Sequence, residues 1–112
     1  MQIEHEGTLI VKEGRIADHF WSRFVGLQFA PSLPEGHGLL IRPCNSVHMF
    51  FMRFAIDVVF LTKDLVVEQI LADLKPWRVS PVVLKAYQTL ELPAGTVAKA
   101  GLKRGDRLTL KE

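Results

Sequence analysis

The hydrophobic pattern of the chain is that of short β-strands separated by turns. Branched and aromatic residues gather in runs of three to six, and most runs end in glycine, proline or charged residues. The predicted strands span 8–11, 39–41, 47–51, 56–61, 66–71, 87–92 and 107–110. Thr62, Lys63 and Asp64 form a turn that predicts a β-hairpin between 56–61 and 66–71.

Apolar residues recur at helical spacing near the N-terminal end, which predicts a short amphipathic helix over 17–24. Its apolar stripe consists of Ala17, Phe20, Trp21 and Phe24. We expect this stripe to pack against the core, Ser22 and Arg23 to face outward, and the helix to end by Gly26.

A single helical turn is predicted over 97–100, capped by Thr96 and ended by Gly101. The segment 76–81 begins and ends with proline, so an irregular crossing is expected there. Many short strands with two short helices predict one α+β domain over 1–112. We expect a curled or barrel-like, mostly antiparallel sheet.

Composition and charge narrow the possible partners. The chain is 48% hydrophobic and 23% charged, typical of a globular protein, and its net charge of +2 comes from dispersed basic residues, which argues against a nucleic-acid partner. Glu4 and Glu6 stand where a secretory signal needs a basic start, and no apolar run is long enough for a membrane helix. We therefore expect a cytoplasmic protein without a membrane partner.

The most informative stretch is 43–61, where polar groups interrupt an apolar run. Cys44 and His48 lie about 13 Å apart if the backbone is extended, but become neighbours if it turns helically. Cys44 is the only cysteine, so no intrachain disulfide forms, and it is either a buried thiol or a nucleophile beside His48. The four dispersed histidines lack metal-ligand spacing, so no metal or cofactor is predicted.

Charged residues farther along offer two roles each. Asp57 either accepts hydrogen bonds from loop amides as a structural anchor, or serves as a ligand-orienting or general-base carboxylate. A bend near Ala55 would bring Arg53 within its reach. Trp77 and Arg78 form either a lid over a ligand or, for the indole, a plug at the end of the barrel.

Three functions are compatible with these residues. The first is a non-enzymatic binding module in which Arg53, Asp57 and Arg78 form a polar pocket edged by Met52 and Trp77, for a small molecule or a peptide end. The second is a small enzyme that uses Cys44, His48 and Asp57 in nucleophilic or acid–base chemistry. The third is an interaction protein that pairs through the edge of its first strand.

An ordered series of motifs also marks a family. They are Arg23 with Gly26-Leu27, Gly38-Leu39-Leu40, Pro43-Cys44-Asn45-Ser46-Val47-His48, Phe51-Met52-Arg53-Phe54, Ile56-Asp57-Val58-Val59-Phe60, Pro76-Trp77-Arg78, Leu90-Glu91-Leu92-Pro93-Ala94-Gly95, and Gly101 with Gly105-Asp106. Over about 17–110 the chain resembles the prokaryotic domain-of-unknown-function family numbered 192. That resemblance implies a compact β-rich domain and brings no established activity.

Overall fold

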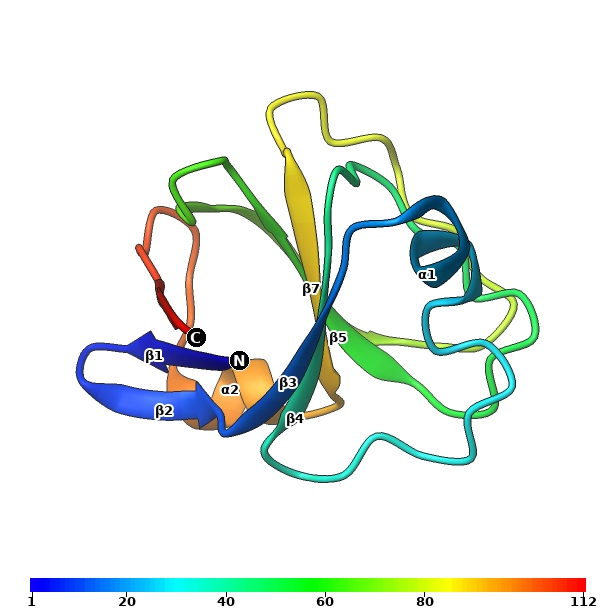
Figure 1. The fold of residues 1–112 in the computed structure, drawn as a ribbon, viewed down its shortest axis with the longest axis horizontal. Helices are drawn as coiled ribbons and strands as arrows, with labels where there is room; N and C mark the ends of the chain where they lie inside the picture. The colour runs from blue at the N-terminus through cyan, green and yellow to red at the C-terminus, as the bar shows by residue number, and fades with distance from the viewer.

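The computed structural model describes residues 1–112 and contains eight strands and two short helices (Figure 1). In chain order the elements are β1 (Gln2–His5), β2 (Thr8–Val11), β3 (Glu13–Ala17), α1 (Phe20–Val25), β4 (His37–Ile41), β5 (Ile56–Leu61), β6 (Val67–Leu74), β7 (Gln88–Pro93), α2 (Thr96–Ala100) and β8 (Thr109–Lys111). The α+β class predicted from the sequence is confirmed.

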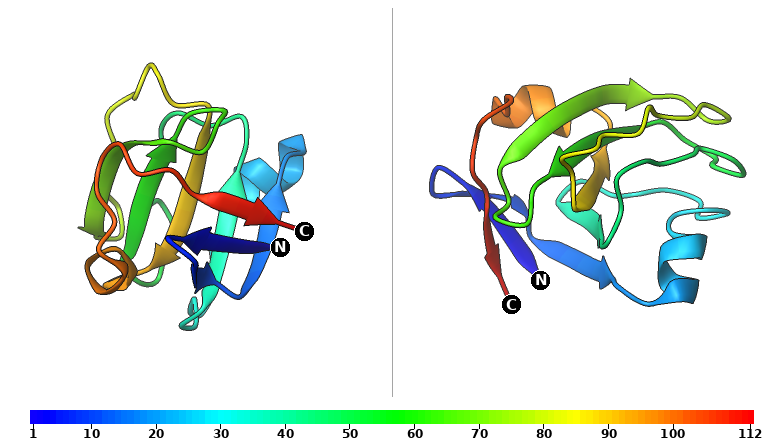
Figure 2. Two further views of the ribbon diagram at one scale, coloured as in Figure 1. Left: turned by 90° about the vertical axis from the view of Figure 1, so that its left-hand side faces the viewer. Right: turned by 90° about the horizontal axis from the view of Figure 1, so that it is seen from above.

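The strands form two sheets that do not close into a barrel. One has the order β2-β1-β8 and the other β3-β4-β7-β5-β6. All neighbouring strands are antiparallel except β3 and β4, which run parallel. Because β1 pairs with β8, the two chain termini lie side by side (Figures 1 and 2).

The five-stranded sheet has a hydrophobic core on each face. The three-stranded sheet and α2 cover one face, and α1 with the long loops lies over the other (Figure 2). All six residues of β5 are buried, and alternate residues serve opposite cores: Val59 and Leu61 join the α2 side, Val58 and Phe60 the α1 side. A strand covered on both faces is expected to be apolar along its length, and β5 is so except at Asp57.

Several predicted strands are confirmed. The first predicted strand is β2, the predicted hairpin is the antiparallel pair β5 and β6, and 87–92 corresponds to β7. The segment between Pro76 and Pro81 contains no regular strand, as expected.

Three predictions about strands were wrong. The predicted strands include neither β1 nor β3; in β3 the charged residues and Gly14 have the composition of a turn. The expected strand over 47–51 is absent: only His48 pairs, in one bridge with Val79, and the chain then turns through Phe50 and Phe51. The segment 77–80 runs alongside and makes backbone hydrogen bonds with Val47 and Met49, but it is too irregular to form a ladder.

The two helices also differ from expectation. The predicted burial of α1 is inverted: Phe20, Trp21 and Phe24 are 67%, 69% and 58% exposed, whereas Arg23 is half-buried. In α2 the cap is Gly95, in left-handed conformation, while the Thr96 hydroxyl donates to the Pro93 carbonyl at 2.7 Å. Neither helix is long and apolar enough to cross a membrane.

Candidate functional site

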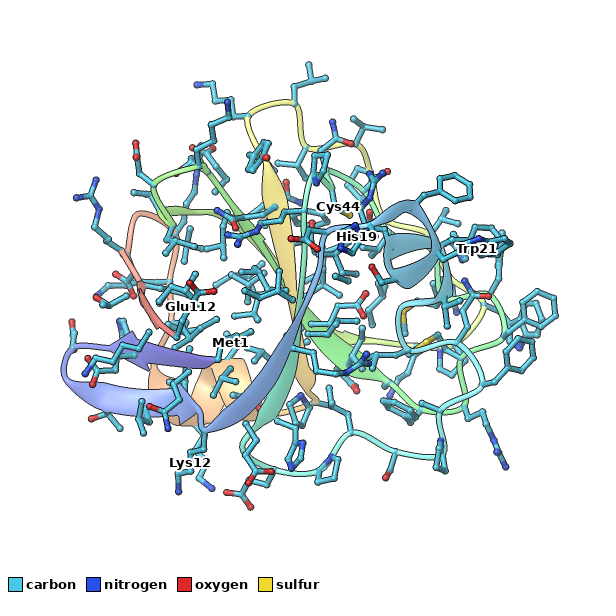
Figure 3. The ribbon with its side chains drawn as sticks, viewed as in Figure 1. Met1, Lys12, His19, Trp21, Cys44 and Glu112 are labelled. Carbon is cyan, nitrogen blue, oxygen red and sulfur yellow. The ribbon has the colours of Figure 1, made fainter.

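A cleft of about 380 Å³ lies between α1 and the segment 43–48, above the α1-side face of the central sheet. Its lining combines eight hydrophobic residues with eight others. The polar and titratable side chains among them belong to Arg23, Gln28, Cys44, Asn45, Ser46, His48 and Glu91. Figure 3 shows Cys44 between the central sheet and α1, and Trp21 pointing outward beyond the helix.

The α1 wall of the cleft is built on a helix of six residues with none buried. Ser22 closes its first turn, since its hydroxyl accepts from the His19 amide at 3.1 Å and donates to the His19 carbonyl at 3.0 Å. The guanidinium of Arg23 turns inward, and its Nη1 donates to the Pro43 carbonyl at 3.3 Å. The Arg23 Nε is buried and has no hydrogen-bond acceptor.

The opposite wall is the segment 43–48, which comes directly after β4 in the chain and is held in place by hydrogen bonds to its backbone. The Cys44 amide donates to the Tyr87 carbonyl at 2.8 Å, and the Thr89 hydroxyl donates to the Cys44 carbonyl at 3.0 Å. Farther along, the Val47 amide donates to the Ser80 hydroxyl at 2.8 Å, so the irregular crossing segment supports this wall.

Cys44 and His48 line the same cleft, yet each is engaged locally rather than with the other. The Cys44 thiol donates to the Ser46 carbonyl at 3.1 Å. The His48 Nδ1 accepts from the Phe50 amide at 3.3 Å, and the imidazole stacks on the Phe50 ring with centroids 4.8 Å apart. No hydrogen bond joins the thiol and the imidazole in the structure.

Glu91 provides the floor of the cleft. It lies in β7, the middle strand of the five, between Leu39 of β4 and Val58 of β5. Its side chain is only 5% exposed, and burial raises the pKa of its carboxyl from 4.5 to about 7. No hydrogen bond or ion pair offsets this burial; in particular, Arg23 lies beyond ion-pair distance. An uncompensated carboxyl beside a cleft is typical of a functional site.

Sequence reasoning did not select Glu91, although a signal for it was present. Leu90 and Leu92 on either side point to the α2-side core, so Glu91 must point to the other face of the same strand. A charged residue between two leucines is ordinary in a strand with one face in solvent. It is unusual only in a strand that is buried on both faces, and the sequence of one strand does not show this.

Asp57 lies elsewhere, at the junction of β5 with the turns beside α2. It is 1% exposed, and its two carboxylate oxygens accept three backbone hydrogen bonds, from Asp73 at 2.9 Å, Gly95 at 3.1 Å and Val97 at 2.9 Å. It does not line the cleft and forms no ion pair with Arg53. This geometry is that of the structural anchor considered among the sequence-based alternatives.

The remaining candidate residues are spread out. Met52 is buried and lines the cleft, whereas Arg53 and Arg78 are exposed and do not. The expectation that Trp77 plugs the end of a barrel was wrong, because its side chain is 60% exposed. The structure therefore brings Cys44, His48 and Met52 together with Arg23 and Glu91, and leaves the other candidates outside. No group of three or more His, Cys, Asp or Glu side chains is placed to hold a metal ion.

Trp77 belongs instead to a chain of exposed aromatic rings. Its ring centroid lies 5.9 Å from that of Phe50 and 5.1 Å from that of Phe51, which in turn stacks on Phe29 at 5.1 Å. Phe50 also contacts His48, so this aromatic chain reaches the rim of the cleft.

Comparison with known proteins gives consistent matches over nearly the whole chain. It is 38% identical over 108 residues to a UPF0127 protein of Pyrococcus furiosus, which covers 92% of this chain and 90% of the relative. A UPF0127 protein of Pyrococcus horikoshii is 35% identical over 101 residues, covering 86% and 85%. The fold is similar to the crystal structure of a protein of unknown function from Novosphingobium aromaticivorans, with a TM-score of 0.84, 22% identity, and coverage of 97% of this chain and 82% of that one.

The family comparison extends beyond the region that the motifs marked. A model of family DUF192, described as "Uncharacterized ACR", matches residues 1–110, which includes β1, β2 and most of β8. The resemblance inferred from the sequence motifs is thereby confirmed, and the chain belongs to the DUF192 family.

Proposed function

We propose that the protein is a small-ligand-binding module whose binding site is the cleft between α1 and the segment 43–48. The observation that carries this proposal is the Glu91 carboxyl, which is buried at the floor of the cleft without a partner. Burying such a group without compensation costs stability, and a ligand that satisfies it supplies the missing partner.

The shape and composition of the cleft support the same proposal. Its volume is at the lower end of the roughly 300–1,000 Å³ common for small-molecule sites. Half of its lining is hydrophobic, and polar groups from both walls and the floor converge on it. Apolar walls with a few directed polar groups are the usual design of a binding site.

The test is a fragment screen observed by NMR on the full chain labelled with ¹⁵N. Fragments of four kinds are used: neutral, cationic, anionic and zwitterionic. We expect at least one kind to shift amide signals of α1, 43–48 and β7. A screen in which no fragment shifts these signals, or in which all shifts fall elsewhere, contradicts the proposal.

The single cysteine provides a control for the location. Cys44 lines the cleft and no other thiol exists, so a maleimide reagent fills the cleft at one position. Labelled protein should lose fragment binding, whereas a Cys44→Ser variant treated with the same reagent should keep it. Equal binding by labelled and unlabelled protein would place the ligand outside the cleft.

An acid–base enzyme is the second candidate, and one observation favours it. A carboxyl whose pKa is raised to about 7 both accepts and donates protons near neutral pH, as a general base or acid must. Glu91 lies in the cleft that Cys44 and His48 line, while Asp57 is committed to backbone amides. Turnover of a bound ligand, abolished by Glu91→Gln with binding retained, would favour the enzyme over the module.

A further inference from the structure

Two unpartnered polar groups of opposite charge lie in the same cleft. The Glu91 carboxyl on β7 accepts no hydrogen bond, and the Nε of Arg23 on α1 is buried without an acceptor. The two side chains do not satisfy each other, because no ion pair joins them. One ligand can therefore supply a cationic group for Glu91 and an anionic group for Arg23.

We infer that the cleft binds a zwitterion, a free α-amino acid or a dipeptide, with its ammonium at Glu91 and its carboxylate at Arg23. This inference rests on the proposed function and adds the ligand class. A ligand with a single charge leaves one of the two groups unsatisfied, and leaving a buried polar group unpaired is costly.

The Arg23 side of the site suits a carboxylate. A guanidinium carries five N–H donors in a planar fork, and Arg23 uses Nη1 on the Pro43 carbonyl. The Nε–H, which is sealed from solvent in the structure, and a second Nη remain, and they offer two parallel donors to a carboxylate that displaces the atoms covering Nε. The bond to Pro43 also fixes the plane of the fork relative to the 43–48 wall.

The Glu91 side suits an ammonium. Its carboxylate lies in an apolar sheet face, where an ion pair is screened far less than at the surface. Phe20 and Phe24 on α1 form part of the same lining, so aromatic rings adjoin the space available to the cation. The cleft volume of about 380 Å³ limits the ligand to a single amino acid or a dipeptide.

Binding of an ammonium requires the ionised form of Glu91, which makes affinity depend on pH. With the carboxyl titrating at about pH 7, affinity should fall about tenfold from pH 8 to pH 6. The other titratable or charged groups of the cleft are Arg23, Cys44 and His48. A His48→Gln variant removes the contribution of the imidazole. The dependence of affinity on pH should persist in His48→Gln and vanish in Glu91→Gln.

The experiment measures binding of the standard free L-amino acids and of dipeptides by NMR and calorimetry. For the tightest binder, two analogues serve as matched probes: the amide, which lacks the carboxylate, and the N-acetyl derivative, which lacks the ammonium. Each analogue should bind at least about tenfold more weakly than the amino acid or dipeptide itself. Whichever of the two classes, free amino acids or dipeptides, contains the tighter binder is the class of ligand that the cleft takes.

Variants assign each charge to its partner. In Arg23→Gln the zwitterion and its amide should bind equally, and in Glu91→Gln the zwitterion and its N-acetyl form should bind equally. Arg53→Gln and Glu6→Gln, which change exposed residues outside the cleft, should preserve both discriminations. If Glu91→Gln fails to fold, Glu91→Leu replaces it.

Failure of this inference is distinct from failure of the proposed function. If neutral or singly charged fragments bind the cleft as well as zwitterions do, the ligand class is wrong and the binding module stands. Zwitterion binding that survives both Arg23→Gln and Glu91→Gln also refutes the assignment. If nothing binds the cleft, both proposals fail.

Discussion

Replacing Glu91 with glutamine should change how the stability of the protein depends on pH. The glutamate titrates at 4.5 when solvated and at about 7 in the fold. Between these values the folded state retains a proton that the unfolded state has released, so stability falls as pH rises. The stability contributed by the retained proton is fully present below pH 4.5, is lost as the pH rises to about 7, and changes no further above that pH. Glutamine has no proton to release, so this slope disappears.

The magnitude follows from the two pKa values. A difference of one pKa unit is worth about 1.4 kcal/mol, so the full effect is about 3 kcal/mol, most of which falls between pH 5 and pH 8. Glu91 is 5% exposed, so solvent screening reduces this little.

The assay is equilibrium unfolding in urea, followed by circular dichroism at several pH values from about 5 to 8. The free energy of unfolding of Glu91→Gln minus that of the original chain should increase by about 2–3 kcal/mol across this range. Glu112→Gln, at an exposed position without an ion pair, is the control and should leave the difference constant. A constant difference for Glu91→Gln as well would refute the account, because the carboxyl would then be as easily ionised in the fold as in water.

Three further predictions concern stability and reactivity. Asp57→Ala should lower the free energy of unfolding by about 3–5 kcal/mol in urea titrations, because three backbone amides lose their acceptor, and Asp57→Asn by less; a loss below about 1 kcal/mol contradicts the anchor role. Gly38→Ala should cost about 1–3 kcal/mol in the same assay, since its Cβ would lie 2.9 Å from a Val11 methyl; an unchanged midpoint shows that the packing relaxes freely. Cys44 should react with iodoacetamide at neutral pH more slowly than a free cysteine peptide, because its thiol is half-buried and bound to Ser46; faster reaction supports the thiol-enzyme alternative.

The sequence predicted those parts of the fold whose pattern is local. The hairpin of β5 and β6 and the strand β7 follow from continuous apolar runs bounded by turn residues. In contrast, β3 depends on a parallel partner, β4, that lies more than twenty residues away, and its own Gly14 and Arg15 read as a turn. The run 47–51 has the composition of a strand, but its neighbour is the irregular segment between Pro76 and Pro81, which supplies one bridge and no ladder.

The candidate site was predicted only in part. Cys44, His48 and Met52 do line the cleft, since they are polar or bulky residues in a run of sequence that must fold back on itself. Arg23 was missed because helical periodicity identifies residues that share a face without saying which face points inward. Glu91 was missed because a single strand does not reveal that both of its faces are covered.

The placement of Glu91 on the middle strand has a consequence for the motions of the cleft. β7 is hydrogen-bonded to β4 on one side and to β5 on the other, so its amide hydrogens should exchange with solvent only when the whole molecule unfolds. The wall made by α1 has six residues and no buried side chain, so we expect it to open at a lower free energy than the sheet. Entry and exit through this cleft would then be governed by local opening of one helix above a fixed carboxyl, and the wall could diverge in sequence while the floor stays unchanged.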